Sequence, residues 1–398
     1  MYSMKNERLL LFTLAAIQFN HVVDFMIMMP LGPQLMRTLE ITPQAFSLLV
    51  SSYTFSAGII GFCGAFFLDR FERKKSLQII FIGFVLGTLA CGLAPNYSFL
   101  MAARILTGGF GGLLGTMVLS IVGDAIPLER RSAAMGLIMT AFSAASVLGV
   151  PAGLFLSAHY SWNMPFIALA AFSVFAHLAI VKWIPVMKDH LAMQPEQRDI
   201  WAPFKMVGGD KNLQRALLLQ MTLMLGHFSL IPFLSPYMVA NVGFTEKELP
   251  LIYLLGGAVS IVSLPLIGKL ADKYGRYKVF IFGILLSVIP QVLITNMPPV
   301  PLYMALMVTT FFFITTGGRT IPASTIITST VTPRQRGSFM SINVAVQQIS
   351  SGIAAYMAGL IIVKDAGGQL QHYNIVGYIA IGFSLIALYV AKNIKPVS

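Results

Sequence analysis

The chain has 398 residues, of which 56% are hydrophobic and only 11% are charged, whereas a soluble domain carries about 25% charged residues. This composition excludes a water-soluble globular protein and leaves no room for a sizeable soluble domain. The net charge of +12 does not indicate nucleic-acid binding, because the basic residues lie in short breaks between apolar runs. Cys63 and Cys91 both fall inside apolar runs, so neither a disulfide framework nor a metal site is expected.

Long apolar runs follow one another along the whole chain, and a membrane-spanning helix needs roughly 20 such residues. The first run is too long for the apolar core of a cleaved signal, so it is expected to be a permanent helix. The polar stretch 185–212 separates two sets of six helices and predicts three parts, namely a bundle over 1–184, a cytoplasmic linker and a bundle over 213–398. The predicted helices cover residues 9–36, 44–68, 76–94, 97–123, 132–157, 163–184, 213–240, 248–269, 278–296, 300–328, 336–362 and 373–391.

Basic residues are distributed unequally between the two sets of loops. If both termini are cytoplasmic, the inner breaks hold most of the 27 basic residues, while the outer breaks hold only Arg37, Lys247 and Lys364. Loops rich in Lys and Arg stay on the cytoplasmic side. The sequence therefore predicts a multi-pass protein with both termini in the cytoplasm. A compact chain without large loops is also typical of a bacterial cytoplasmic (inner) membrane.

The two halves of the sequence are related to each other. One common offset places Asp69–Lys75 on Asp272–Lys278, and the same offset places Asp24 on His227. Two related halves of parallel topology are the physical interpretation, and transporters commonly bind substrate between such halves near the bilayer midplane. The predicted fold is an all-α membrane protein of twelve transmembrane helices, in two six-helix bundles related by pseudo-twofold symmetry.

The charged loop after the second helix of each half carries a recognisable pattern. The second copy, from Gly268 to Lys278, reads Gly-x-x-x-Asp-(Arg/Lys)-x-Gly-(Arg/Lys)-x-(Arg/Lys), whereas Ala65 and Glu72 replace the two glycines of the first copy. With this pattern the chain resembles the major facilitator superfamily over essentially its whole length. The two missing glycines indicate that gating at the first loop is altered.

Two further motifs lie in helices 4 and 5. Arg104 is followed by four glycines in helix 4, and residues 149–153 of helix 5 contain the sequence Gly-Val-Pro-Ala-Gly. Both resemble motifs of the drug:proton antiporter branch, although Val150 interrupts the usual Gly-Pro pair, as in arabinose-type sugar-efflux permeases. Glycines four positions apart inside apolar helices, such as Gly108 and Gly112, predict close helix contacts and not phosphate binding.

The resemblance implies that the charged loops and the helix-5 motif act in gating. The loops are expected to lock the two halves on the inner face when the transporter opens outward, and the helix-5 proline is expected to kink or open its helix. The residues assigned to gating are Asp69, Arg70, Arg73, Asp124, Gly149, Pro151, Gly153, Asp272, Lys273 and Arg276.

Few ionisable side chains lie at membrane depth, where each costs at least about 2.5 kcal/mol at a helix centre without a partner or a watery cavity. Asp24 lies on the first helix, past the bilayer midplane when counted from the inner side. The resemblance puts Asp24 and Arg104 on facing walls of the transport cavity. We expect Asp24 to carry the transported proton, with Arg104 controlling its proton affinity as the pair is made and broken. A fixed ion pair that only holds two helices together and direct contact with the substrate are the alternatives.

His227 and Arg319 lie at similar depths in the second half and make that wall electropositive, which favours an anionic or zwitterionic substrate. His227 is assigned to proton coupling and to substrate binding, and Arg319 to substrate binding. A histidine satisfied by neighbouring helices is the alternative for His227. The other substrate-binding candidates, whose polar or aromatic side chains are equally typical of helix packing, are Gln18, Asn20, His21, Phe312 and Gln347.

The predicted function is secondary active transport by alternating access, specifically proton-coupled multidrug-type efflux (antiport) of a small organic or amphiphilic compound, anionic compounds included. An importer, a uniporter or a lipid-like flippase of the same fold is the first alternative. A membrane receptor or enzyme without transport is the alternative of another class, but no metal, phosphate-loop or nucleophile motif supports an enzyme. The expected partners are the substrate, protons and the lipid bilayer, with no nucleic acid. The chain is expected to be monomeric and to need no cofactor beyond the proton gradient.

Overall fold

The computed structural model describes residues 4–188, 191, 202–332 and 335–396. Within these residues, twelve helices are long and apolar enough to cross a membrane. This number confirms the predicted all-α membrane architecture. Of the predicted linker 185–212, residues 189–190 and 192–201 lie outside the described residues, and 202–209 form a short helix.

The first half of the chain forms long helices that are interrupted in two places by short turns of other helix types. Their bounds are α1 Met4–Ile27, α2 Gly32–Thr38, α3 Pro43–Phe67, the 3-10 turn η1 Leu68–Arg70, α4 Arg73–Gly92, α5 Tyr97–Ala125, α6 Leu128–Ala144, the π turn η2 Ala145–Gly149, α7 Val150–His159 and α8 Met164–Trp183.

The second half has a similar order of long helices, with a short helix at its start and a short hairpin before its last helix. The bounds are α10 Ala202–Gly209, α11 Lys211–Phe228, α12 Ile231–Tyr237, the π turn η3 Met238–Val242, α13 Leu249–Tyr274, α14 Arg276–Thr295, α15 Leu302–Thr328, α16 Arg336–Ile361, β1 Val363–Lys364, β2 Leu370–Gln371 and α17 Tyr373–Lys392. The two strands are antiparallel.

The prediction of one continuous helix over 9–36 is wrong in detail. Helix α1 ends at Ile27, and the chain turns before α2 begins at Gly32. Proline lacks the N–H that continues a helix and disfavours helical backbone in the residue before it, so Pro30 and Pro33 account for the break. The repeat preserves this feature, because α11 ends at Phe228 and is followed by the separate helix α12.

The contacts divide the chain into two compact units. One unit contains the chain up to Met28 and continues from Ser52 through α8, and the other contains 29–51 and the helices from α10 onward. Segment 29–51 belongs to the second unit because Phe46 packs edge-on against Phe233. The predicted boundary at 185–212 rests on the long polar stretch of the sequence and stays a prediction.

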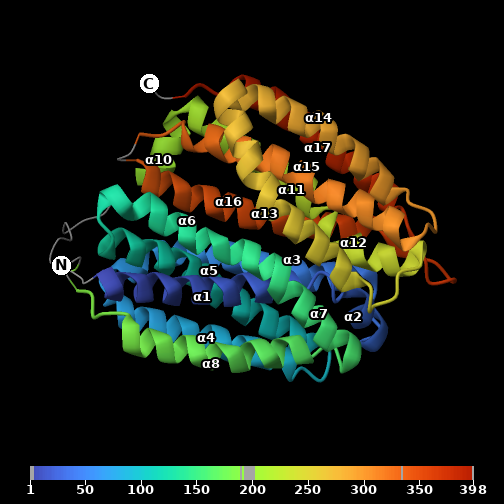
Figure 1. Cartoon of the computed structure of the whole chain (residues 1–398), viewed down its shortest axis with the longest axis horizontal. Coiled ribbons are helices and arrows are strands. Elements are labelled where there is room, and N and C mark those ends of the chain that lie inside the picture. The colour runs from blue at the N-terminus through green and yellow to red at the C-terminus, as the bar shows by residue number, and fades with distance from the viewer. Residues whose placement is uncertain (1–3, 189–190, 192–201, 333–334, 397–398) are drawn as a thin grey trace. The chain divides into compact units, whose positions relative to one another are not determined.

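Helices of the first unit pack around α1, α4 and α5 (Figure 1). Helix α5 approaches α3 so closely that a Cβ on Gly108 would lie 2.4 Å from the carbonyl oxygen of Tyr53, and one on Gly112 would lie 2.2 Å from that of Ala57. The predicted close helix contact is therefore present. It brings the side chain of Arg104, one turn before Gly108, next to α3.

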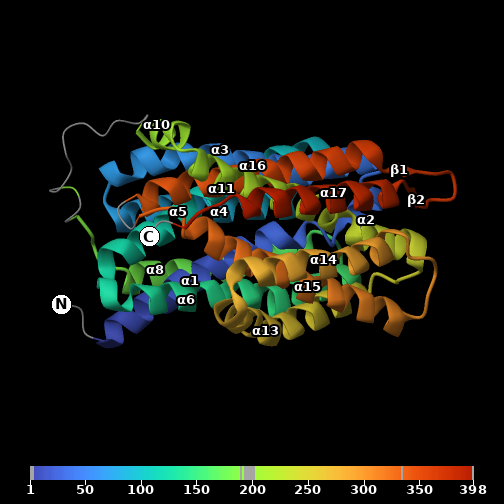
Figure 2. The same cartoon turned by 90° about the horizontal axis from the view of Figure 1, so that it is seen from above.

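In the second unit, α11 packs against α16 and α17 (Figure 2). Helices α14 and α15 meet at two glycines, where a Cβ on Gly283 would lie 2.3 Å from the carbonyl oxygen of Gly318. This approach fixes the backbone beside Arg319, the next residue of α15.

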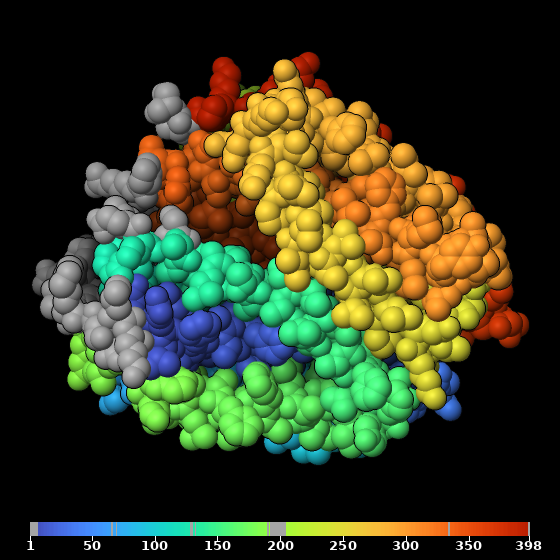
Figure 3. All heavy atoms as spheres, viewed as in Figure 1, coloured from blue at the N-terminus to red at the C-terminus, as the bar shows by residue number. Residues whose placement is uncertain are grey.

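Long apolar side chains cover the outside of the helices, as lipid contact requires. Helix α13 runs along the face shown in Figure 3, and its exposed apolar side chains include Leu254, Leu255, Ile261, Val262, Leu266 and Leu270.

Substitution of two glycines of α5, one that contacts α3 and one that does not, tests this packing. Gly112→Ala should lower the thermal midpoint in detergent, because its Cβ collides with backbone and overpacking costs about 1–3 kcal/mol. Gly115→Ala is the matched control, since a Cβ there meets nothing within 4 Å. Equal thermal midpoints for the two variants would contradict the close contact of α3 and α5.

Candidate functional site

A buried ion pair joins α1 to α5. Asp24 is 0% exposed and Arg104 is 1% exposed, and Arg104 Nη1 lies 2.9 Å from Asp24 Oδ2. Thr88 of α4 donates a hydrogen bond of 3.0 Å to the other carboxylate oxygen, Asp24 Oδ1. The carboxylate is therefore held by donors from two helices, and breaking a buried pair of this kind is strongly unfavourable for the charge that remains.

Aromatic and polar groups surround the arginine of this pair. The guanidinium carbon of Arg104 lies 4.2 Å from the ring centroid of Tyr53 on α3, a cation–π contact. Arg104 Nε and the Tyr53 hydroxyl are buried without a hydrogen-bond partner among the described atoms. The site thus holds one satisfied ion pair together with spare hydrogen-bonding groups.

The three predicted substrate residues that precede Asp24 on α1 differ in their contacts. Asn20 donates to the Ala16 carbonyl and accepts from the Ser173 hydroxyl of α8, which is a contact that holds helices together. His21 lies beside Tyr53, and in the described structure both of its ring nitrogens are buried without a partner. Gln18 is partly buried.

A second buried arginine lies in the other unit. Arg319 of α15 is 1% exposed and donates to Ser384 Oγ of α17 at 3.2 Å. Its Nη2 lies 3.2 Å from Nδ1 of His227 on α11. The ring of Phe312 stacks on that of His227 with a centroid distance of 6.3 Å. The structure therefore brings these predicted substrate residues together, whereas Gln347 is partly buried on α16.

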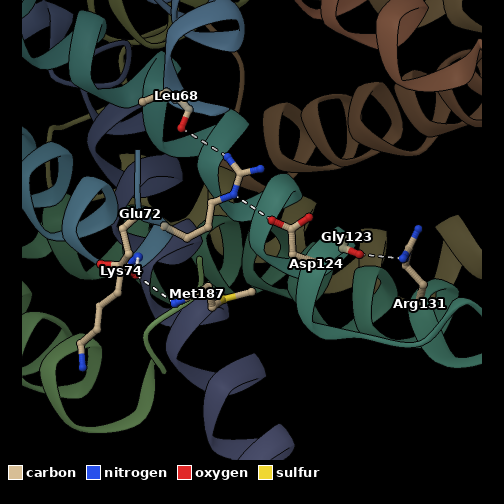
Figure 4. A network of polar contacts seen from close by, with 8 residues as sticks. Leu68, Glu72, Lys74, Gly123, Asp124, Arg131 and Met187 are labelled. Atoms are coloured by element: carbon tan, nitrogen blue, oxygen red, sulfur yellow. Dashed lines mark hydrogen bonds and ion pairs between the residues drawn. The ribbon is translucent and has the colours of Figure 1, made fainter. Parts of the chain in front are cut away.

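A polar network fastens the charged loop of the first unit (Figure 4). Arg73 Nε forms an ion pair of 2.8 Å with Asp124 at the end of α5. Glu72 caps α4 by accepting from the backbone N–H groups of Lys74 and Lys75, and it also accepts from the N–H of Met187. The loop is thus tied to α5 and to the segment after α8 within the same unit.

The remaining charged residues assigned to gating make fewer contacts. Arg70 lies over the ring of Phe67, and Lys273 lies over the ring of Tyr274. Asp272 and Arg276 are exposed, and in the described residues their side chains form no ion pair. The side chain of Asp69 lies outside the described part of the structure. A gating role for all of these residues stays a prediction.

The motif of residues 149–153, in the fifth predicted helix, lies where a π turn is followed by the α-helix α7. The π turn η2 ends at Gly149, directly before the helix that contains Pro151. A Cβ on Gly149 would lie 2.3 Å from a methyl group of Val23, and one on Gly153 would lie 2.7 Å from Ile27 Cδ1. Proline removes a helical hydrogen bond, and π turns occur often at functional sites. The motif thus combines an irregular turn with close contact to α1 near Asp24.

Sequence reasoning missed the residues that complete these sites. Thr88, Tyr53 and Ser384 are polar residues in otherwise apolar helices, which was the available signal. That signal is weak, because a hydroxyl in a helix often bonds to its own backbone, as Ser384 does to the Ala380 carbonyl. Glu72 was noted only as a departure from the glycine pattern. No group of three or more His, Cys, Asp or Glu side chains suited to a metal ion occurs among the described residues.

The sequence profile of the Major Facilitator Superfamily matches residues 14–217 and 216–396. The chain belongs to this superfamily. Superfamily relatives include Multidrug resistance protein 2 of Bacillus subtilis (strain 168), which is 22% identical and covers 90% of this chain and 90% of its own length. Another is the inner membrane transport protein YdhP of Escherichia coli O157:H7, which is 24% identical and covers 92% of each chain.

Solved structures of superfamily members share the fold. A bacterial homologue of the human lysosomal transporter Spinster matches with a TM-score of 0.80 at 16% identity, covering 99% of this chain and 98% of the other. The D-xylose–proton symporter matches with a TM-score of 0.78 at 15% identity and the same coverage. As a member of this superfamily, the protein is a secondary transporter and not an enzyme. It spans the inner membrane several times and acts on a small-molecule substrate.

The cap formed by Glu72 predicts a pH-dependent contribution to stability. Burial alone would raise the pKa of Glu72, but hydrogen bonds from the backbone of Met187, Lys75 and Lys74 hold this pKa below its usual value. A depressed folded-state pKa stabilises the fold above the unfolded pKa, and that stability is lost as the pH falls through the folded value. Glu72→Ala should therefore lower the free energy of unfolding by about 1 kcal/mol at pH 7, the usual contribution of a helix cap.

Thermal unfolding in detergent at pH 7 and at acid pH measures this effect. The difference between wild type and Glu72→Ala should shrink as the pH falls below the usual pKa of glutamate. Glu72→Gln is the matched control, because glutamine keeps an acceptor oxygen for the cap but cannot ionise, so its stability relative to Glu72→Ala should not change with pH. A difference between wild type and Glu72→Ala that is independent of pH would argue against the cap.

Proposed function

We propose that this transporter is a proton-coupled exporter, an antiporter that releases a small organic or amphiphilic compound, anionic compounds included, in exchange for protons. The observation that carries the proposal is the buried ion pair of Asp24 and Arg104. Among the described residues, Asp24 is the one carboxylate that is 0% exposed, and it lies inside the span Glu7–Ile27. A carboxylate at this depth is the simplest carrier for a proton crossing the membrane.

The pair offers a way to change proton affinity with conformation. While Arg104 and Thr88 hold Asp24, their charge and hydrogen bonds favour the ionised carboxylate. When helix movement separates Asp24 from Arg104, the carboxylate loses its counter-charge in a medium of low dielectric constant and takes up a proton. Alternating access that makes and breaks this pair would load the proton on one side of the membrane and release it on the other.

Export, and not import, is favoured by the motifs and by a relative. The motif that begins at Arg104 and the motif at residues 149–153 resemble those of the drug:proton antiporter branch. One relative carries the name Multidrug resistance protein 2. Polar atoms of His21 and Tyr53, which lie beside the pair, have no hydrogen-bond partner in the described part of the chain and provide hydrogen-bonding groups for water or substrate. We infer from the excess of basic residues in the inner loops that both termini lie in the cytoplasm.

Transport by the purified protein in liposomes under an imposed pH gradient tests the proposal. Internal pH is recorded with the dye pyranine while anionic, zwitterionic and cationic amphiphiles are added in turn. For the wild type we expect a compound that evokes proton movement. For Asp24→Asn we expect this movement to fall to the rate of protein-free liposomes, because asparagine cannot carry the proton, while binding of that compound persists.

The matched control is Glu7→Gln, which removes the other carboxylate of α1, an acid paired with Arg130 near the helix start. This variant should transport like the wild type. Proton-coupled flux that is unchanged in Asp24→Asn would make the pair a purely structural link between α1 and α5. Substrate flux that is indifferent to the pH gradient would identify a uniporter or a flippase instead.

A further inference from the structure

The two units contain corresponding arginine sites that differ in one respect. The internal repeat places His227 at the position of Asp24, and Arg104 and Arg319 each lie on the fourth long helix of their half. In the first unit the arginine contacts a carboxylate. In the second unit the corresponding contact is to an imidazole. The second site therefore has a buried arginine at the corresponding position but no carboxylate paired with it.

In the described residues, no carboxylate of the second half lies beside Arg319 as Asp24 lies beside Arg104. Within the described residues, Arg319 contacts only the Ser384 hydroxyl and His227 Nδ1 through its terminal nitrogens, and its Nε is buried without a partner. The one acidic residue in the spans of this half is Asp272, which is exposed in the last turn of α13. Arg319 is thus a buried cation whose neighbours are neutral.

The tautomer of His227 follows from the chemistry of its neighbour. A guanidinium has only donors, so Nδ1 of His227 accepts the hydrogen bond from Arg319 and carries no proton. The ring is then neutral, with its proton on Nε2, which leaves a second N–H donor at the site. Phe312 stacks on this ring, and the approach of Gly283 to Gly318 fixes the backbone before Arg319.

A guanidinium buried without a counter-charge is unfavourable at membrane depth, and its fork of donors matches a carboxylate or phosphate in two parallel hydrogen bonds. We propose that Arg319 and His227 form an oxyanion site, which takes the carboxylate, sulfonate or phosphate group of the transported compound. The ligand supplies the negative charge that Asp24 supplies in the first unit. This inference rests on the proposed function in one respect, namely that the bound anion is the exported compound.

Binding to the purified protein in a neutral detergent tests the site without any proton gradient. The probes share a phenyl group and differ in charge: benzoate, benzenesulfonate and phenyl phosphate are the anions, and benzamidine is the cation. Binding is measured with radiolabelled benzoate and by the shift of the thermal midpoint. For the wild type we expect binding and stabilisation by the anions and neither by benzamidine. Failure of all three anions to bind the wild type would overturn the proposal.

Two variants assign the binding to this site. His227→Asp supplies the missing carboxylate from the protein itself, so it should raise the thermal midpoint of the free protein and weaken anion binding about tenfold or more. Arg319→Gln should weaken binding to the same extent. Arg215→Gln is the matched control, because it removes a cation from the start of the helix that carries His227 and leaves the site intact. Unchanged anion binding in His227→Asp, a variant that keeps every donor of Arg319, would also overturn the proposal.

The same oxyanion chemistry occurs in lipid headgroups, and a second pair of measurements separates the two sources. The protein is placed in nanodiscs of phosphatidylcholine alone or with phosphatidylglycerol. Stabilisation by phosphatidylglycerol that requires Arg319, together with loss of benzoate binding, would assign the site to a lipid and overturn its assignment to the exported compound. Benzoate binding that is equal in both nanodiscs supports the transported anion.

The outcome is independent of the test of proton coupling. Asp24→Asn should bind benzoate like the wild type, because Asp24 and Arg319 belong to different units. If benzoate binding fails while proton movement through Asp24 persists, only the oxyanion site is disproved. If binding at Arg319 is present and proton movement is absent, the proposed proton coupling fails and the oxyanion site stands.

Discussion

The structure depends on the need to neutralise charge inside an apolar membrane. Arg104 is buried in the first unit, and its charge is matched by Asp24 on another helix. The pair fixes α1 against α5, Thr88 adds α4 through its hydrogen bond, and Tyr53 adds α3 through its ring. Four helices thus share one electrostatic contact, and movement of any of them changes the environment of the carboxylate. A group that joins helices in this way is well suited to couple protonation to conformation.

Glycines make that contact possible. Helices α3 and α5 approach to backbone contact at Gly108 and Gly112, and α14 and α15 do so at Gly283 and Gly318. Because the hydrophobic effect does not drive helices together in lipid, small residues allow the close van der Waals contact that holds them together. In both units the close approach lies within about one turn of the buried arginine. Helix packing and charge placement are therefore parts of one arrangement.

The two units bury different sets of charged groups. The first contains the ion pair of Asp24 and Arg104 with a hydrogen bond from Thr88, and the second contains Arg319 with neutral neighbours. Outside the membrane-spanning helices, Glu72 occupies the place of a family glycine and ties the charged loop to Met187. The departure from the family pattern thus adds a hydrogen-bonded cap at this loop.

The sequence by itself determined the number of spanning helices, the internal repeat and the residues able to carry charge at membrane depth, because hydrophobic length and rare ionisable groups are local properties. Pro30 and Pro33 also contained the signal for the break after α1, which the apolar run concealed. Only the tertiary structure decided that Asp24 contacts Arg104 and Thr88, and that Ser384 and His227 contact Arg319. Such contacts depend on which helices are neighbours and how each is rotated, and neither is encoded in the spacing along one helix.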